Sequence, residues 1–244
     1  IRGEREAFQS VESHFAKFKE TDRALYFSSG YLANLAVLTT FPEDGDIVFS
    51  DELNHASLID GTRLSYAAYI VFPHNDVSTL SRLMQQHSGE GRIFVLVESI
   101  FSMDGDEAPL AEHAQLCRDQ GACLIVDEAH STGIYGNKGE GLVVSLDLQD
   151  RIFARLFTFG KAMGAHGSVW IGSAILKDYL INYCRSFIYT TALPAHSVAH
   201  IQSAYNFLSE NPQRIQELHH NIRLFKKVVS QNSIEGFIAS DSPI

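Results

Sequence analysis

Residues 93–130, IFVLVESIFSMDGDEAPLAEHAQLCRDQGACLIVDEAH, contain the pattern that decides the fold. The apolar runs 93–98 and 122–127 have the length and composition of buried strands. Between them, residues 110–120 follow a helical pattern. Strands that alternate with amphipathic helices in this way predict a mostly parallel sheet flanked by helices.

The same alternation extends over most of the chain. Further buried strands are expected at residues 23–28, 46–50, 68–72, 156–158 and 168–172, and further helices at 34–40, 55–64 and 77–87. The chain opens in helical register, and after about residue 174 helices dominate, including 197–209 and 212–231. The expected fold is therefore α/β, a three-layer α/β/α arrangement with a mostly parallel central sheet.

Composition narrows the class of protein. The 244 residues are 45% hydrophobic, and the formal net charge of −10 argues against a nucleic-acid partner, which needs clustered Lys and Arg. No apolar run reaches the roughly 18 residues of a membrane helix, so no membrane partner is expected. The three cysteines are odd in number and fit no metal or redox spacing, which predicts no metal site and a reduced, cytoplasmic location.

Charged side chains stand at the ends of three successive predicted strands. Glu98 ends one strand, Asp127 ends the next, and Lys161 follows the third by way of Phe-Gly. Any one of them alone is most simply an ordinary loop residue. Because ligands of open α/β sheets lie beyond the carboxyl ends of the strands, three in succession indicate a site in one crevice.

A glycine-led turn adds a possible anion cradle. The first predicted strand runs into Ser29-Gly30-Tyr31 and then a helix, and a helix start with a glycine lets backbone N–H groups approach an anion. On its own this signal is weak. No Walker sequence and no G-x-G-x-x-G is present, so a nucleotide-binding module loses support.

Six segments together resemble the α-oxoamine synthases, fold-type I enzymes that use pyridoxal 5′-phosphate (PLP). They are FSSGYLAN (27–34), NHASLIDG (54–61), ESIFSMDGD (98–106), VDEAHSTG (126–133), TFGKAMG (158–164) and IYTTALP (188–194). Their joint occurrence, in the family's order, covers nearly the whole chain. The resemblance implies a PLP-binding large domain at 21–232, an N-terminal helix at 1–20 that joins it, and at 233–244 the start of a C-terminal small domain that is otherwise absent.

The resemblance also implies roles around the cofactor ring. Lys161 is expected to hold PLP as a Schiff base and to move protons at the substrate α-carbon. Asp127 is expected to pair with the pyridine nitrogen and His55 to stack on the ring. His130 and Ser102 are expected to contact the phenolic oxygen.

Further positions are assigned to the phosphate in the same way. The backbone of Gly30 and Tyr31 and the hydroxyl of Thr158 resemble phosphate ligands. Thr190 and Thr191 resemble residues that reach the phosphate of a neighbouring subunit, which implies a homodimer. Glu98 is either a site residue or part of its support, and the nine other histidines are expected at the surface or in packing.

Within the family, the motifs are most similar to the branch that makes 8-amino-7-oxononanoate in biotin biosynthesis. This implies a C-acyltransferase that condenses L-alanine, with decarboxylation, with a pimeloyl thioester carried on CoA or acyl-carrier protein. Glycine C-acetyltransferases and serine palmitoyltransferases share most of the motifs, so another amino acid and acyl-CoA stay open. A truncated, non-catalytic dimerising remnant is a third alternative.

Overall fold

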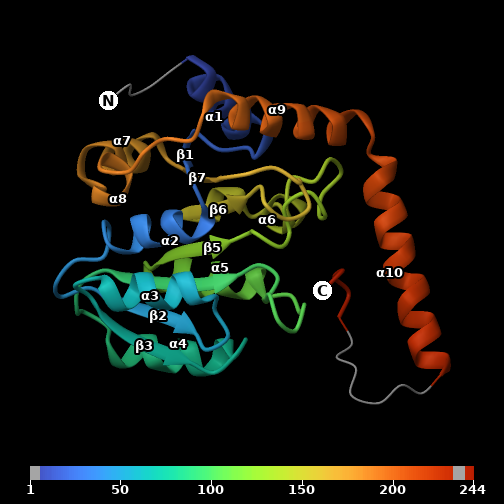
Figure 1. Cartoon of the computed structure of the whole chain (residues 1–244). Helices are drawn as coiled ribbons and strands as arrows, with labels where there is room; N and C mark the ends of the chain where they lie inside the picture. The colour runs from blue at the N-terminus through green and yellow to red at the C-terminus, as the bar shows by residue number, and fades with distance from the viewer. Residues whose placement is uncertain (1–5, 233–239) are drawn as a thin grey trace.

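The computed structural model describes residues 6–232 and 240–244, and these form a seven-stranded sheet with helices on both faces (Figure 1). The strands are β1 (Arg23–Phe27), β2 (Ile47–Asp51), β3 (Ala68–Phe72), β4 (Ile93–Glu98), β5 (Cys123–Asp127), β6 (Ala154–Thr158) and β7 (Ser168–Gly172). The helices are α1 (Glu6–Phe18), α2 (Gly30–Leu38), α3 (Ala56–Leu64), α4 (Val77–Gln86), α5 (Leu110–Gln120), α6 (Leu142–Ser145), η1 (Gln149–Arg151), α7 (Ala174–Tyr183), α8 (Arg185–Ile188), α9 (Ala195–Glu210) and α10 (Gln213–Gln231).

The sheet is mostly parallel, as the alternation of strands and helices predicted. Its strand order is β1-β7-β6-β5-β4-β2-β3. Strands β6, β5, β4, β2 and β3 pair in parallel, whereas β7 pairs antiparallel with both β1 and β6. Parallel strands with helices on both sides bury both faces, and β2 and β4 are accordingly buried along their whole length.

Three apolar clusters hold the layers together. One face of the sheet packs against α2, α3 and α7 through residues such as Leu25, Leu156 and Trp170. The other face packs against α4, α5 and α6 over β2, β3, β4 and β5, and against α1 and α9 over β1, β6 and β7. The predicted three-layer α/β/α fold is therefore confirmed.

Several element boundaries differ from the predicted ones by a few residues, and two of these differences have a clear local reason. Helix α2 begins at Gly30 rather than at residue 34, because the Ser29 hydroxyl caps it and accepts a hydrogen bond from the Leu32 N–H at 3.2 Å. Strand β6 begins at Ala154 rather than at 156. Arg155, a charged residue, lies buried within the strand because its guanidinium donates to the Lys19 carbonyl oxygen at 2.6 Å.

The predicted domain division stays a prediction. Residues 1–5 and 233–239 lie outside the described residues, and these ranges include part of the predicted N-terminal helix and most of the expected start of a small domain. After that gap, the Ser240 hydroxyl donates to the Gly105 carbonyl oxygen at 2.6 Å, so the last residues contact the loop that follows β4.

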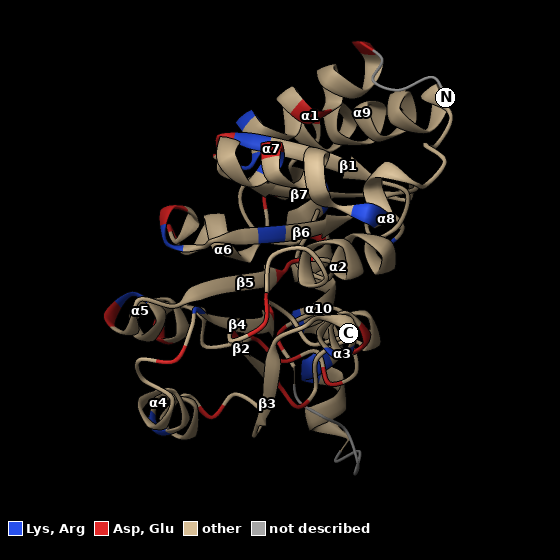
Figure 2. Cartoon of the chain, turned by 90° about the vertical axis from the view of Figure 1, so that its left-hand side faces the viewer, with Lys and Arg blue, Asp and Glu red and all other residues tan. Residues whose placement is uncertain are grey.

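Basic side chains are spread over the surface of the described part of the chain (Figure 2). Figure 2 shows Lys and Arg dispersed over several helices rather than gathered on one element. Within residues 6–232 and 240–244, no helix has both the length and the apolar character needed to cross a membrane.

Candidate active site

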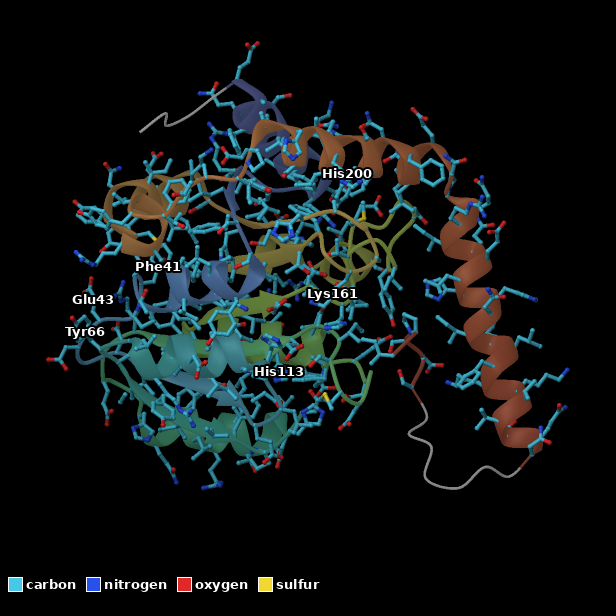
Figure 3. The ribbon with its side chains drawn as sticks, viewed as in Figure 1. Phe41, Glu43, Tyr66, His113, Lys161 and His200 are labelled. Carbon is cyan, nitrogen blue, oxygen red and sulfur yellow. The ribbon has the colours of Figure 1, made fainter. Side chains whose placement is uncertain are left out.

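The polar ends of β4, β5 and β6 meet at one edge of the sheet. Glu98 and Asp127 are register partners at the ends of β4 and β5, and Lys161 lies three residues beyond the end of β6. Figure 3 shows Lys161 on the side where these strands end, away from Phe41 and Tyr66 in loops that precede β2 and β3. Glu98, Asp127 and Lys161 therefore lie at the same edge of the sheet, as predicted from their positions at the ends of strands.

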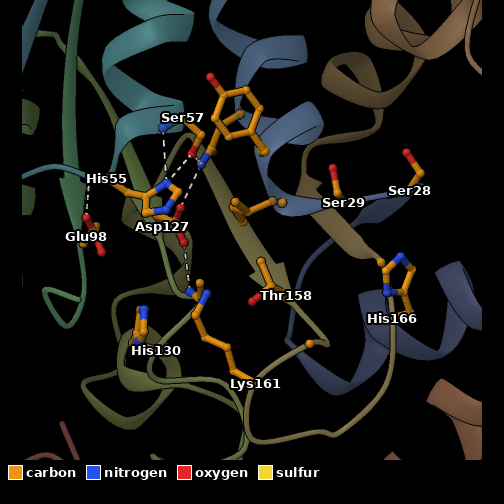
Figure 4. Close-up of a pocket in the computed structure, with 17 residues that line it drawn as sticks. Ser28, Ser29, His55, Ser57, Glu98, Asp127, His130, Thr158, Lys161 and His166 are labelled. Atoms are coloured by element: carbon orange, nitrogen blue, oxygen red, sulfur yellow. Dashed lines mark hydrogen bonds between the residues drawn. The ribbon is translucent and has the colours of Figure 1, made fainter. Parts of the chain in front are cut away.

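A cavity of about 250 Å³ opens at this edge (Figure 4). Its walls come from the start of α2, the start of α3, the ends of β4, β5 and β6, and the loop between β6 and β7. The lining residues are Ser28, Ser29, Gly30, Tyr31, Asn34, His55, Ser57, Glu98, Asp127, Ala129, His130, Leu156, Thr158, Gly160, Lys161, His166 and Gly167.

Asp127 is a buried carboxyl, 5% exposed, whose two oxygens are held separately. Oδ1 accepts from the Ala129 backbone N–H at 2.9 Å, and Oδ2 accepts from the Asn34 side-chain amide at 2.9 Å. Both donors are neutral, so they orient the carboxyl without neutralising it. A buried anion fixed in this way suits a cationic partner in the cavity.

His55 is the N-cap of α3, and its position is fixed at both backbone and ring. Its backbone N–H donates to Glu98 Oε1 at 2.5 Å. Its ring Nδ1 accepts from the Ser57 backbone N–H at 3.2 Å and lies 2.8 Å from the Ser57 hydroxyl. The ring is therefore held over the cavity rather than free to rotate.

Burial shifts the proton affinity of two further lining groups. Glu98 is 2% exposed, and its burial, reinforced by the neighbouring Asp127 charge, raises its pKa to about 8. Burial, with the nearby charges of Lys161 and His55, lowers the pKa of His130 to about 4. At neutral pH the cavity thus holds a protonated carboxyl and an uncharged imidazole.

The start of α2 forms a cradle for an anion. A Cβ atom on Gly30 would lie 2.6 Å from the Thr158 methyl carbon, so only glycine leaves this approach between helix and strand open. The Thr158 hydroxyl is buried beside it and has no hydrogen-bond partner among the described residues. An unpartnered buried hydroxyl next to a helix N-terminus fits a phosphate oxygen. Tyr31 stands at the mouth of the cradle, where its hydroxyl bonds to Asp60.

Lys161 is an exposed residue whose amine points back over the cavity. Figure 4 shows its side chain directed toward Asp127 and His55 rather than away from them. Its charge acts on both Glu98 and His130, which places the ammonium among these groups. A lysine in this position can reach an aldehyde bound between the phosphate cradle and Asp127.

The structure does not bring every predicted residue to the cavity. Ser102 lies at the tip of a short loop closed by the bridge between Ile100 and Glu107, and it does not line the cavity. Thr190 and Thr191 follow α8 and do not line it either. Their expected contact with the phosphate of another subunit stays a prediction.

Several lining residues had no site role assigned from the sequence, among them Asn34, Ser57 and His166. Asn34 and Ser57 belong to the segments 27–34 and 54–61 that resemble the family, but the resemblance implied no role for either, and an uncharged residue in a predicted helix does not by itself indicate a site. His166 was expected with the other histidines at the surface or in packing; it is exposed, and it also lines the cavity from the loop between β6 and β7. Its place next to Gly167 in that loop was the available hint.

A family model described as aminotransferase class I and II matches residues 3–243. The chain belongs to this family. Among curated relatives, the 8-amino-7-oxononanoate synthases of Citrifermentans bemidjiense and Lysinibacillus sphaericus are 40% and 39% identical, each over 233 residues. These alignments cover 95% and 96% of this chain but 60% and 59% of the relatives, so the chain spans less than two thirds of their length.

Solved structures agree with the family assignment. An 8-amino-7-oxononanoate synthase from Francisella tularensis superimposes with a TM-score of 0.87 at 32% identity, covering 100% of this chain and 70% of that one. A serine palmitoyltransferase from S. paucimobilis, in a complex with PLP and myriocin, gives a TM-score of 0.94 at 28% identity, covering 99% and 63%. The resemblance to the α-oxoamine synthases and to the fold-type I transferases is confirmed.

Proposed function

We propose that this chain binds PLP through Lys161 and carries the cofactor site of an 8-amino-7-oxononanoate synthase. The observation that supports this most is the grouping of an accessible amine, a buried carboxylate and an anion cradle around one cavity. The names and identities of the curated relatives support the choice of enzyme.

The residues present fit the cofactor. The start of α2 and the Thr158 hydroxyl would hold its phosphate, and Asp127 its ring nitrogen. When bound, PLP supplies an aldehyde that condenses with amines and a ring that accepts electrons from the substrate α-carbon. The protein side of that chemistry is positioning and proton transfer.

Each side chain has a task that its surroundings support. The Asp127 carboxylate would favour a proton on the ring nitrogen of the bound cofactor, since an opposite charge at about 4 Å is worth about 4 kcal/mol at an effective dielectric of about 20. Lys161 takes a proton from the substrate α-carbon and returns it. His130, uncharged at neutral pH, offers a hydrogen bond without adding charge.

The proposed reaction joins L-alanine to a pimeloyl thioester, on CoA or an acyl-carrier protein. The amino acid carboxylate leaves as CO₂, and the thiol carrier leaves as the new carbon–carbon bond forms. A homodimer is part of the proposal, because Thr190 and Thr191 lie away from the cavity of their own chain. Cytoplasmic location is supported by the unpaired thiols of Cys117, Cys123 and Cys184.

The test of cofactor binding is covalent trapping. The chain is mixed with PLP, reduced with borohydride and digested, and the modified peptide is identified by mass spectrometry. We expect the label on Lys161, a near-visible absorption band before reduction, and the loss of both in Lys161→Ala. Lys177→Ala is the control, because Lys177 is paired with Glu12 and lies outside the cavity. A label that persists in Lys161→Ala contradicts the assignment.

Substrate choice needs a second experiment. L-alanine, glycine and L-serine are added separately to the PLP-loaded chain, and the absorption spectrum is followed, before turnover is measured with pimeloyl and short-chain thioesters. A response confined to L-alanine and turnover with the pimeloyl donor support the proposal. Preference for serine would favour the serine palmitoyltransferase reading, for which the structural likeness is the specific observation. Cofactor binding without any turnover would favour a non-catalytic remnant.

A further inference from the structure

Two buried polar residues without an assigned role connect Asp127 to His55. Asn34 and Ser57 are each 1% exposed. The Asn34 amide nitrogen lies 2.9 Å from Asp127 Oδ2 and 2.9 Å from the Ser57 hydroxyl oxygen. That hydroxyl lies 2.8 Å from His55 Nδ1. The four side chains form one unbroken line of hydrogen bonds from the end of β5 to the start of α3.

The direction of each hydrogen bond follows from the carboxylate. An ionised Asp127 can only accept, so the group that Asn34 turns toward it must be the amide NH₂. The two amide hydrogens are then used by Asp127 and by the Ser57 oxygen. With its oxygen accepting from Asn34, Ser57 directs its own hydrogen to His55 Nδ1.

A second donor at the same ring nitrogen supports this direction. The Ser57 backbone N–H also points at His55 Nδ1, at 3.2 Å. If Nδ1 bore a hydrogen, it would face that N–H directly. The neutral His55 ring therefore accepts at Nδ1 and has its hydrogen on Nε2.

We propose that Asn34 and Ser57 are positioning residues that couple the ionisation of Asp127 to the tautomer of His55. This deepens the proposed function, because both ends of the line face the cofactor cavity. An anionic Asp127 sets the hydrogen on Nε2, so His55 presents a donor to the cavity. The carboxylate that would hold the cofactor ring thus also defines the hydrogen-bonding character of the imidazole beside it.

Replacement of Asp127 by asparagine makes a directional prediction. The Ala129 N–H holds the side-chain oxygen at the Oδ1 position, so the new NH₂ of Asp127→Asn would face Asn34. Asn34 would then turn its oxygen toward both neighbours, Ser57 would donate to it, and the Ser57 oxygen would accept from His55. The side-chain part of the line reverses and draws the His55 hydrogen toward Nδ1, while the Ser57 backbone N–H still opposes a hydrogen there, so the tautomer ratio shifts without a complete exchange.

The experiment is long-range ¹H–¹⁵N NMR on the histidine-labelled, full 244-residue chain without cofactor. Spectra are recorded at about pH 7.5, above the ordinary histidine pKa of about 6.5. The His55 signals are assigned by their loss in His55→Gln. We expect the Nε2–H tautomer in the unsubstituted chain and, in Asp127→Asn, a change of about tenfold in the tautomer ratio toward Nδ1–H, as expected for one net hydrogen bond.

Two variants separate the line of hydrogen bonds from general effects. Ser57→Ala cuts the line, so adding Asp127→Asn to it should no longer change the tautomer. Thr62→Val is the matched control, because it removes another buried hydroxyl from the same helix. That hydroxyl donates to the Leu58 carbonyl oxygen and is not part of the line. Thr62→Val should leave the His55 signals unchanged.

The outcomes are distinct. The proposal is overturned if His55 in the unsubstituted chain is the Nδ1–H tautomer. It is also overturned if the tautomer is unchanged in folded Asp127→Asn, or if Asp127→Asn changes it equally in the Ser57→Ala background. If Asp127→Asn does not fold, Asn34→Ala is measured instead. A His55 tautomer ratio in Asn34→Ala equal to the ratio in Thr62→Val then overturns the proposal. Because no cofactor is added, this result is independent of whether PLP is trapped on Lys161.

Discussion

The substitution Glu98→Gln tests whether the raised pKa of Glu98 makes the stability of the folded chain depend on pH. In the folded chain, burial and the adjacent Asp127 charge raise the pKa of Glu98 from 4.5 to about 8. The folded chain therefore keeps a proton on Glu98 in a pH range where the unfolded chain has lost it. Each rise in pH across that range favours the unfolded state.

The size of the effect follows from the two pKa values. At about 1.4 kcal/mol per pH unit, a rise from 4.5 to about 8 corresponds to at most about 5 kcal/mol of unfolding free energy, lost between these limits. Glutamine mimics the protonated side chain. Its oxygen can still accept from the His55 N–H, and its NH₂ stands where the carboxyl O–H was, but it cannot ionise.

The assay is urea unfolding of the chain without cofactor at several pH values from about 5 to about 9. We expect the two proteins to be similarly stable at pH 5, and the unsubstituted chain to become progressively less stable than Glu98→Gln as the pH rises toward 8. Glu112→Gln, at an exposed position on α5, is the control and should show no such divergence. A stability difference between the unsubstituted chain and Glu98→Gln that stays constant over the whole range refutes the reasoning.

Three further predictions concern the anion cradle at Gly30, the hydrogen bonds of His74 to Asp51 and Asp106, and the buried Lys19. Gly30→Ala should weaken PLP binding in a fluorescence titration and cost about 1–3 kcal/mol of stability by overpacking, whereas Gly160→Ala, whose Cβ would meet nothing closer than 3.9 Å, should do neither. Burial opposes the charge on His74, but hydrogen bonds to Asp51 and Asp106 outweigh it and raise its pKa above 6.5. Its contribution to stability should be complete below pH 6.5 and disappear as the pH rises through the raised value, so the urea midpoints of the unsubstituted chain and His74→Gln should converge from pH 6 to pH 9. Burial lowers the pKa of Lys19 to about 7, so the chain should gain stability relative to Lys19→Met as the pH rises from 7 toward 10, and parallel pH profiles would contradict this.

Much of the fold and part of the site could be predicted from the sequence. Apolar runs such as 93–98 and 122–127 became strands because fully buried parallel strands need continuous apolar composition, which is visible in one dimension. Asp127 and Lys161 could be named as candidates because Asp127 ends such a run and Lys161 follows one by way of Phe159-Gly160, and the ends of parallel strands lie at one edge of the sheet.

Other site features could not be predicted, because they depend on contacts between distant segments. Asn34 donates a hydrogen bond to Asp127, which lies 93 positions later in the sequence, and the helical pattern around Asn34 does not predict this contact. Ser102 belongs to a strongly matching motif, yet the bridge between Ile100 and Glu107 sets it at a loop tip outside the cavity.

The sequence alone predicted the strands along the chain from short apolar runs, and the family from six segments spread over most of it. The assignment of Lys161 as the reactive lysine stays a prediction. Only the tertiary structure decided which groups share the cavity and in what protonation state. Glu98 holds its proton because folding removes it from water and sets Asp127 beside it on the neighbouring strand. Desolvation and charge proximity are properties of three-dimensional packing, and a linear pattern does not contain them.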